Sequence, residues 1–270
     1  MPILSDYHMH TPRCKHAAGP MEAYIERGIA LGLREIGFSD HNPLPNGLAG
    51  NVRMEEAELE DYVADVLRLR DRYRGQIDVK LGIEMDYLEG FASYCAVMIA
   101  RYPWDYVIGS VHYLDPQCRT GSWPKEFGGD AHKLYARYLE LMRQLAQAGL
   151  FDIVAHFDVV KRSGCNPTHR EADDIDRTLD EIKRADLCVE INTSGFRHSE
   201  LAQPEPYPSL PIAKKALAHG IVLSVNSDAH APGQVGLRFP EIEQWLIEHG
   251  CRQLARFDRR QRTTYALRSE

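Results

Sequence analysis

The sequence lacks the features of several protein classes. Its six cysteines are scattered without a CxxC pair, which argues against a disulfide framework or a thiolate zinc site. No apolar run approaches the roughly 20 residues that span a bilayer. The start, MPILSDYHMH, has neither the basic region nor the cleavage site of a signal peptide. We therefore expect a cytoplasmic protein with reduced thiols.

Positive charge is also scarce. The 270 residues include 32 Lys and Arg against 39 Asp and Glu, which gives a formal net charge of −7. Nucleic acids and anionic membranes attract basic surfaces, so neither is expected as a partner. The length and the 44% hydrophobic content suit one α/β domain, which we expect to span residues 1–270. The sequence does not set the oligomeric state.

A glycine-rich phosphate loop is missing after the first predicted strand. The sequence instead alternates short apolar β-rich segments with amphipathic helical stretches, including residues 20–32, 55–73 and 131–149. Parallel strands with helical crossovers form either an open doubly wound sheet or a closed barrel, and the missing loop favours the barrel. The seven predicted strands are 2–7, 34–40, 77–85, 104–112, 151–156, 187–193 and 221–227.

Six of these seven strands end in a possible metal ligand. In a parallel barrel the carboxyl ends of all strands share one face, so these side chains would converge. Strand alternation points both histidines of HMH to the same side, and imidazoles with bridging carboxylates suit zinc, iron or manganese. A lone histidine is more often a core or surface residue, but the repetition indicates a metal site. The strand-end candidates are His8, His10, His41, Glu84, His112, His156, Asp228 and His230.

In order, these motifs resemble those of the PHP (polymerase and histidinol phosphatase) family: HMH at 8–10, SDH at 39–41, GIE at 82–84, GSVH at 109–112, AH at 155–156 and SDAH at 227–230. The resemblance implies an α/β fold, a distorted (β/α)7 barrel with the metal site at the C-terminal ends of the strands. It also implies three divalent ions, of zinc, iron or manganese. One would be held by His8, His10, Glu84 and Asp228, a second by Glu84, His112 and His156, and the third by His16, His41 and His230.

Four further segments resemble histidinol-phosphate phosphatases within the family: HTPRCKHA, GSVHYLD, EFGGDAHKLYARYLE and EINTSGFR. They imply hydrolysis of L-histidinol phosphate, in histidine biosynthesis, by a metal-bridging hydroxide that attacks phosphorus. Asp228 and His230 are candidates for donating a proton to the leaving alcohol. Because a fold does not fix a substrate, another small phosphate monoester, a nucleotide or phosphotyrosine stays open.

Substrate phosphate calls for cationic side chains near the metals. Arginine suits this role because its planar guanidinium can bind two phosphate oxygens at once. Arg162, six residues after His156, and Arg197, after the sixth predicted strand, are the main candidates. Arg53 and Lys161 are weaker ones. The segment from Pro204 to Pro211 is expected to form a rigid lid or connection beside the pocket.

Two alternatives belong to other functional classes. A metal-dependent amidohydrolase also uses an HxH motif and a late aspartate, but it often has a lysine where this chain has Glu84, and His16 and His41 would be superfluous. A non-catalytic, metal-stabilised domain like those attached to polymerases is disfavoured by the complete ligand set and by the lack of an attached domain.

Overall fold

The computed structural model describes residues 2–119, 130–164, 166–198 and 204–267. Its centre is a nine-stranded sheet in which strands that follow one another in sequence are also neighbours in space. All neighbouring pairs are parallel except the last, which is antiparallel. All seven predicted strands are confirmed. The strands are β1 (Ser5–Asp6), β2 (Glu35–Phe38), β3 (Asp78–Asp86), β4 (Tyr106–Ser110), β5 (Ile153–Val154), β6 (Cys188–Asn192), β7 (Leu223–Asn226), β8 (Gln253–Asp258) and β9 (Gln261–Ala266).

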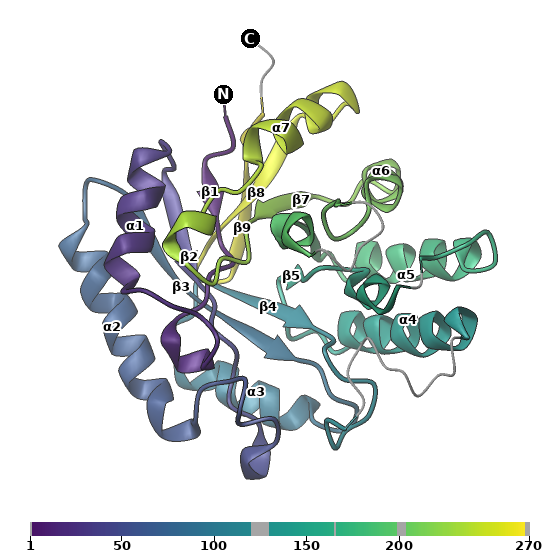
Figure 1. Ribbon diagram of the computed structural model, residues 1–270, viewed down its shortest axis with the longest axis horizontal. Helices are drawn as coiled ribbons and strands as arrows, with labels where there is room; N and C mark the ends of the chain where they lie inside the picture. The colour runs from purple at the N-terminus through teal and green to yellow at the C-terminus, as the bar shows by residue number, and fades with distance from the viewer. Residues whose placement is uncertain (1, 120–129, 165, 199–203, 268–270) are drawn as a thin grey trace.

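Helices cover the outside of this sheet. In Figure 1, α1, α2 and α3 lie on one side of the strands and α4, α5 and α6 on the other. None of the helices in the described ranges combines the length and apolarity needed to cross a bilayer. The helices are α1 (Met21–Ala30), α2 (Leu59–Arg72), α3 (Ala92–Arg101), α4 (Ala131–Gln147), α5 (Ala172–Arg184), α6 (Leu210–Ala218) and α7 (Phe239–Glu248).

The sheet curves so that its seventh strand returns to its first. A parallel bridge joins Met9 to Ala229, where the amide of His10 donates to the carbonyl of Ala229 at 2.9 Å. Side chains supply other links across this seam, since the amide of Tyr7 donates to the Asn226 side chain at 2.8 Å. The ends of β1 and β7 therefore lie side by side but share only a short stretch of backbone hydrogen bonds. Because this junction is so short, the barrel is distorted.

Tyr106 of β4 fills the space inside the curve. Its ring lies against Gly37 and Gly82, where an added Cβ would overlap the ring atoms. Its hydroxyl is 2.6 Å from the carbonyl of Tyr7, and Phe257 packs nearby with ring centroids 6.3 Å apart. A packed layer of this kind fills the barrel beneath the strand ends that carry the predicted metal site.

The hairpin of β8 and β9 was not predicted, so the expectation of seven strands was incomplete. Arg259 and Arg260 form its two-residue turn with φ values of 47° and 64°. Such turns usually carry Asn or Gly, and two arginines give no comparable signal in the sequence. Leu254 and Phe257 of β8 are nevertheless buried, so the hairpin is part of the core.

Candidate metal centre

The first group of ligand atoms lies at the end of β1. His8 Nε2 and His10 Nε2 lie 3.3 and 3.6 Å from one oxygen of Glu84. Asp228 also faces both rings, with one oxygen 3.8 Å from His8 Nε2 and 3.2 Å from His10 Nε2. Donor atoms of His8, His10 and Glu84 lie within 4.8 Å of one another, a spacing that one cation can span.

Glu84, at the end of β3, connects this group to a second one. Its other oxygen lies 3.0 Å from His156 Nε2 and 3.5 Å from His112 Nε2. A third group consists of His16, His41 and His230, whose donor atoms also lie within 4.8 Å of one another. All nine predicted ligands therefore gather in one place, although His16 comes from a loop rather than a strand end.

Several nitrogen and oxygen atoms of these ligand candidates are buried and make no hydrogen bond within the described residues, although some lie close to one another: His41 Nδ1 is 2.8 Å from Glu84 Oε2, and His10 Nε2 is 3.2 Å from Asp228 Oδ1. An unpaired buried polar atom costs free energy, and a cluster of such atoms is what a bound cation would satisfy. Imidazole and carboxylate donors in this mixture fit divalent metals such as zinc, iron or manganese. The unpaired atoms are His8 Nε2, His10 Nε2, His41 Nδ1, Glu84 Oε2, His156 Nδ1 and Asp228 Oδ1.

Carboxylates behind the rings orient three of the histidines. His8 Nδ1 lies 2.7 Å from Glu190, and His112 Nδ1 lies 2.9 Å from Asp86. Asp40 plays the same part for His10, at 3.3 Å. Each contact fixes the ring so that Nε2 points into the cluster, an arrangement common around bound metals.

Sequence reasoning missed these three carboxylates, although a signal was present. Asp86 lies two residues after Glu84 on β3, so strand alternation places it on the same face. Asp40 directly precedes the ligand His41. The strand at 187–193 was the one that ended in no predicted ligand, and it contains Glu190.

Burial and mutual charge set the protonation of the cluster. Burial raises the pKa of Glu84 and Asp228, but the surrounding histidines outweigh it, and both pKa values lie well below their usual range. Burial also lowers the pKa of His41 to about 4 and that of His230 to about 2. The carboxylates are therefore ionised and these two imidazoles neutral, which are the forms that bind metals. For His8, His10 and His112 burial lowers the pKa, but the neighbouring carboxylates outweigh it and the pKa is raised, so a bound metal would displace their protons.

The sequence matches the family model described as PHP domain over residues 6–194, which is more than half of the chain. The chain belongs to the PHP family. It is 33% identical to the probable histidinol-phosphatase of Deinococcus radiodurans, over 92% of this chain and 95% of the relative. It is 27% identical to the histidinol-phosphatase of Bacillus subtilis, over 87% of this chain and 96% of the relative.

A solved structure has the same fold. It is histidinol phosphate phosphatase from Lactococcus lactis, complexed with zinc, L-histidinol and phosphate, and it superposes with a TM-score of 0.79 at 21% identity. The match covers 96% of this chain and 98% of the other. The expected fold, an α/β barrel of the PHP type, is thereby confirmed.

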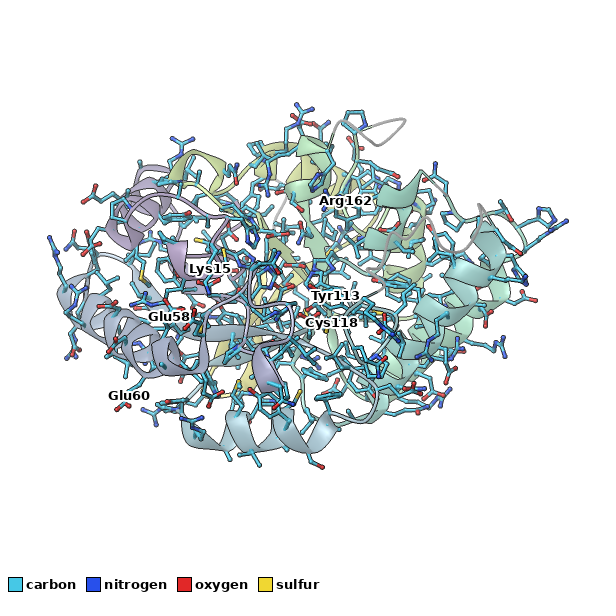
Figure 2. All side chains as sticks on the ribbon, turned by 60° about the horizontal axis from the view of Figure 1, so that its bottom comes forward. Lys15, Glu58, Glu60, Tyr113, Cys118 and Arg162 are labelled. Carbon is cyan, nitrogen blue, oxygen red and sulfur yellow. The ribbon has the colours of Figure 1, made fainter. Side chains whose placement is uncertain are left out.

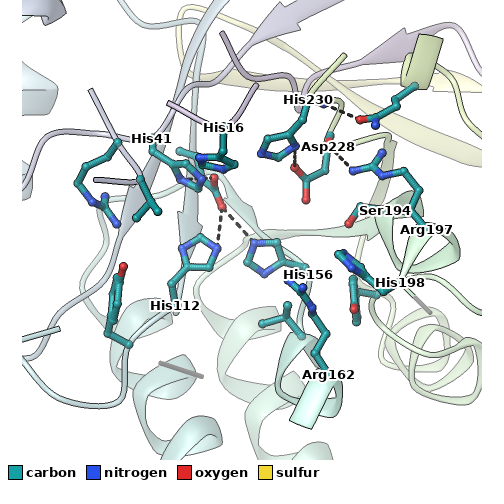
Figure 3. A pocket seen from close by; sticks show the side chains of 17 residues that line it. His16, His41, His112, His156, Arg162, Ser194, Arg197, His198, Asp228 and His230 are labelled. Carbon is teal, nitrogen blue, oxygen red and sulfur yellow. Dashed lines mark hydrogen bonds and ion pairs between the residues drawn. The ribbon is translucent and has the colours of Figure 1, made fainter. Parts of the chain in front are cut away.

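A cavity of about 480 Å³ opens over the cluster of this PHP domain. Arg162 and Arg197 both line it, together with Ser194, on the side away from His16 and His41 (Figure 3). Figure 2 shows Arg162 near the middle of the molecule in that view. The two main candidates for phosphate binding therefore share one cavity with most of the candidate metal ligands.

Arg197 also supports the loop that carries Asp228. Its guanidinium donates to the carbonyls of Ser227 and Asp228 at 3.1 and 2.7 Å. Asp228 has a φ of 50°, in the left-handed region, so its backbone needs such support. Burial lowers the pKa of Arg197, although arginine stays charged at any ordinary pH.

The two weaker candidates are engaged elsewhere. Arg53 lines the cavity, but its guanidinium donates to Asp86 at 2.6 Å and to the carbonyl of Asn42 at 2.9 Å. Lys161 is not among the residues that line the cavity, and its buried ammonium lies 3.3 Å from Asp158 and 3.1 Å from Glu205. Arg53 therefore supports the histidine-orienting Asp86, and Lys161 lies behind the cavity wall.

The segment EFGGDAHKLYARYLE, one of the four that resemble histidinol-phosphate phosphatases, extends beyond the described residues. Its first four residues, 126–129, lie outside them. The remainder forms the start of α4, where the Asp130 side chain accepts a hydrogen bond from the amide of Lys133. This part of the segment begins a helix and holds none of the ligands.

Proposed function

We propose that this PHP domain is a metal-dependent phosphatase that hydrolyses L-histidinol phosphate to L-histidinol and phosphate. The observation that carries the proposal is one cavity lined by both the ligand cluster and two arginines. The 33% identity to a relative named as a probable histidinol-phosphatase supports the choice of substrate. We further propose that residues 1–270 act as one domain in the cytoplasm, in histidine biosynthesis.

The ligand cluster would hold three divalent ions. Glu84 would be shared between two of them, because one of its oxygens faces His112 and His156 while the other faces His8 and His10, and also His41 at 2.8 Å. When bound, such ions neutralise phosphate oxygens and lower the pKa of water so that it can attack phosphorus. This partition agrees with the three groups of nearby donor atoms described above.

The protein's own residues would position the ester and move its protons. Arg162 and Arg197 would bind phosphate oxygens from the side of the cavity opposite His16 and His41. Asp228 and His230 also line the cavity, so either would transfer a proton from the attacking water to the leaving alkoxide. Their lowered pKa values keep both groups unprotonated at rest but also make them weak bases, so this transfer would depend on a lowered pKa of the attacking water.

The test is phosphate release from L-histidinol phosphate beside nucleotides, sugar phosphates and phosphotyrosine, with metals counted in the same sample. We expect a strong preference for L-histidinol phosphate and about three metals per chain. His230→Ala should lower both the metal content and the turnover while the fold is retained. Equal turnover of all esters would contradict the proposed preference for L-histidinol phosphate. No turnover by metal-loaded protein would contradict the proposed phosphatase activity.

A further inference from the structure

The segment Glu205–Ser209, here called the Tyr207 wall, contributes Tyr207 to the lining of the cavity. Tyr207 lines the cavity although it is only 1% exposed. Lys161 does not line the cavity, and its ammonium lies 4.8 Å from the centroid of the Tyr207 ring. The lysine therefore contacts the ring from behind the wall.

Lys161 attaches this wall to the η5 turn (Val159–Ser163), which follows β5. Its side chain is fully buried and donates to the carbonyl of Pro206 at 2.7 Å and to Glu205 at 3.1 Å. Asp158, next to the turn, accepts a hydrogen bond from the amide of Ser209 at 2.9 Å. The buried ammonium of Lys161 thus holds the start of the wall, and Asp158, which it contacts at 3.3 Å, holds the end.

The opposite side of the wall is attached to β6 and the η6 turn (Thr193–Arg197). The backbones of Tyr207 and Asn192 exchange hydrogen bonds of 2.6 and 2.9 Å, as in an antiparallel ladder. Gly195 approaches so closely that an added Cβ would overlap the carbonyl oxygen of Glu205. The Asn192 side chain also donates to Asp228 at 3.2 Å, so Asn192 contacts both the wall and a candidate metal ligand.

The wall has the chemistry to receive the organic end of a substrate. Phosphate is drawn to the metals and the two arginines, so the remainder of the ester must contact other lining residues. Tyr207 and His198 both line the cavity, and their ring centroids are 6.1 Å apart. An aromatic imidazole packs favourably against such rings.

We propose that Lys161 is a positioning residue that holds the Tyr207 wall in place, and that this wall recognises the imidazole end of the substrate. The proposal rests on the function proposed above for its choice of substrate. It replaces direct phosphate binding by Lys161 with an action through Tyr207. Loss of the ammonium would remove the cation from Asp158 and Glu205 and free the start of the wall, at Glu205 and Pro206, from the η5 turn.

The experiment measures binding of the product L-histidinol to metal-loaded protein by calorimetry, which does not depend on turnover. Lys161→Met and Tyr207→Leu should each weaken binding by about 10- to 100-fold, the scale of a misplaced contact, with metal content unchanged. Because Lys161 acts through Tyr207, the double variant should bind no more weakly than Tyr207→Leu alone. Lys214→Met, at an exposed lysine of α6, is the matched control and should bind like the unaltered protein.

Unaltered affinity in Lys161→Met, additive losses in the double variant, or no binding of L-histidinol by the unaltered protein would each overturn the proposal. Tyr207→Leu decides the role of the wall even if Lys161→Met does not fold. Turnover of L-histidinol phosphate by the unaltered protein is measured separately. Its absence would overturn the proposed function, while the binding results would still decide the role of the wall.

Discussion

Glu190 offers the sharpest test of how the metal centre is built. One of its oxygens faces His8 Nδ1 at 2.7 Å and the Asn226 amide group at 3.0 Å. The other oxygen accepts from the backbone amide of His156 and from the Asn192 side chain, each at 3.0 Å. Burial raises the pKa of Glu190, but His8 outweighs this and the pKa lies below its usual value. Only an ionised carboxylate accepts all four bonds.

Glu190→Gln preserves the shape of this side chain but replaces one acceptor with a donor. If the amide nitrogen faces His156, the backbone N–H there loses its partner, which costs about 1–3 kcal/mol. If it faces His8, Nδ1 must become the acceptor, and the proton moves to Nε2, the atom that points to Glu84. Either outcome weakens the metal site, and loss of such an orienting partner typically lowers metal affinity or activity by about 10- to 100-fold.

The assay is titration of metal-free protein with zinc or manganese, followed by calorimetry and by phosphate release at each metal concentration. Glu60→Gln is the matched control, because Glu60 is an exposed carboxylate on α2 at the edge of the molecule in Figure 2. Folded Glu190→Gln protein with unaltered metal affinity and turnover would refute the reasoning.

Three further changes test other parts of the structure. Arg53→Met should weaken metal binding and lower the free energy of unfolding by about 3–5 kcal/mol, because buried Asp86 loses its cation. Retained metal with a raised KM would instead indicate that Arg53 contacts the substrate. Arg197→Ala should lower kcat/KM about 100-fold at saturating metal, as for loss of one transition-state donor, and an unchanged kcat/KM would show that Arg197 does not act in the site. Gly82→Ala should force a Cβ into Tyr106, cost about 2–3 kcal/mol and lower the melting temperature by about 5–10 °C, whereas Gly233→Ala, with open space around it, should melt normally.

The fold and the nine clustered candidate ligands were predictable because both depend on local patterns. Short apolar strands alternate with amphipathic helices, and a parallel barrel brings all strand ends to one face. The candidate ligands therefore occur at predictable places in the sequence, such as HMH after β1 and SDAH after β7. His16 is the exception, since it lies in a loop and only the family resemblance pointed to it.

Contacts between distant strands were not predictable in the same way. Glu190 and His8 are 182 residues apart, and their pairing depends on how the sheet curves. The engagement of Arg53 with Asp86 and the burial of Lys161 likewise depend on which loops fold over the strand ends. A sequence pattern identifies a cationic residue near the site, but only the packing decides whether its charge faces the cavity or an internal carboxylate.

The orienting carboxylates also change the charge balance of the site. Five carboxylates lie in or beside the cluster: Glu84, Asp228, Asp40, Asp86 and Glu190. Three dications, as proposed, would exceed these by one positive charge, and Arg53, bonded to Asp86, raises the excess to two. Arg162 and Arg197, which line the cavity, raise the excess to four, so the loaded site would attract a phosphate monoester dianion although the whole chain is acidic.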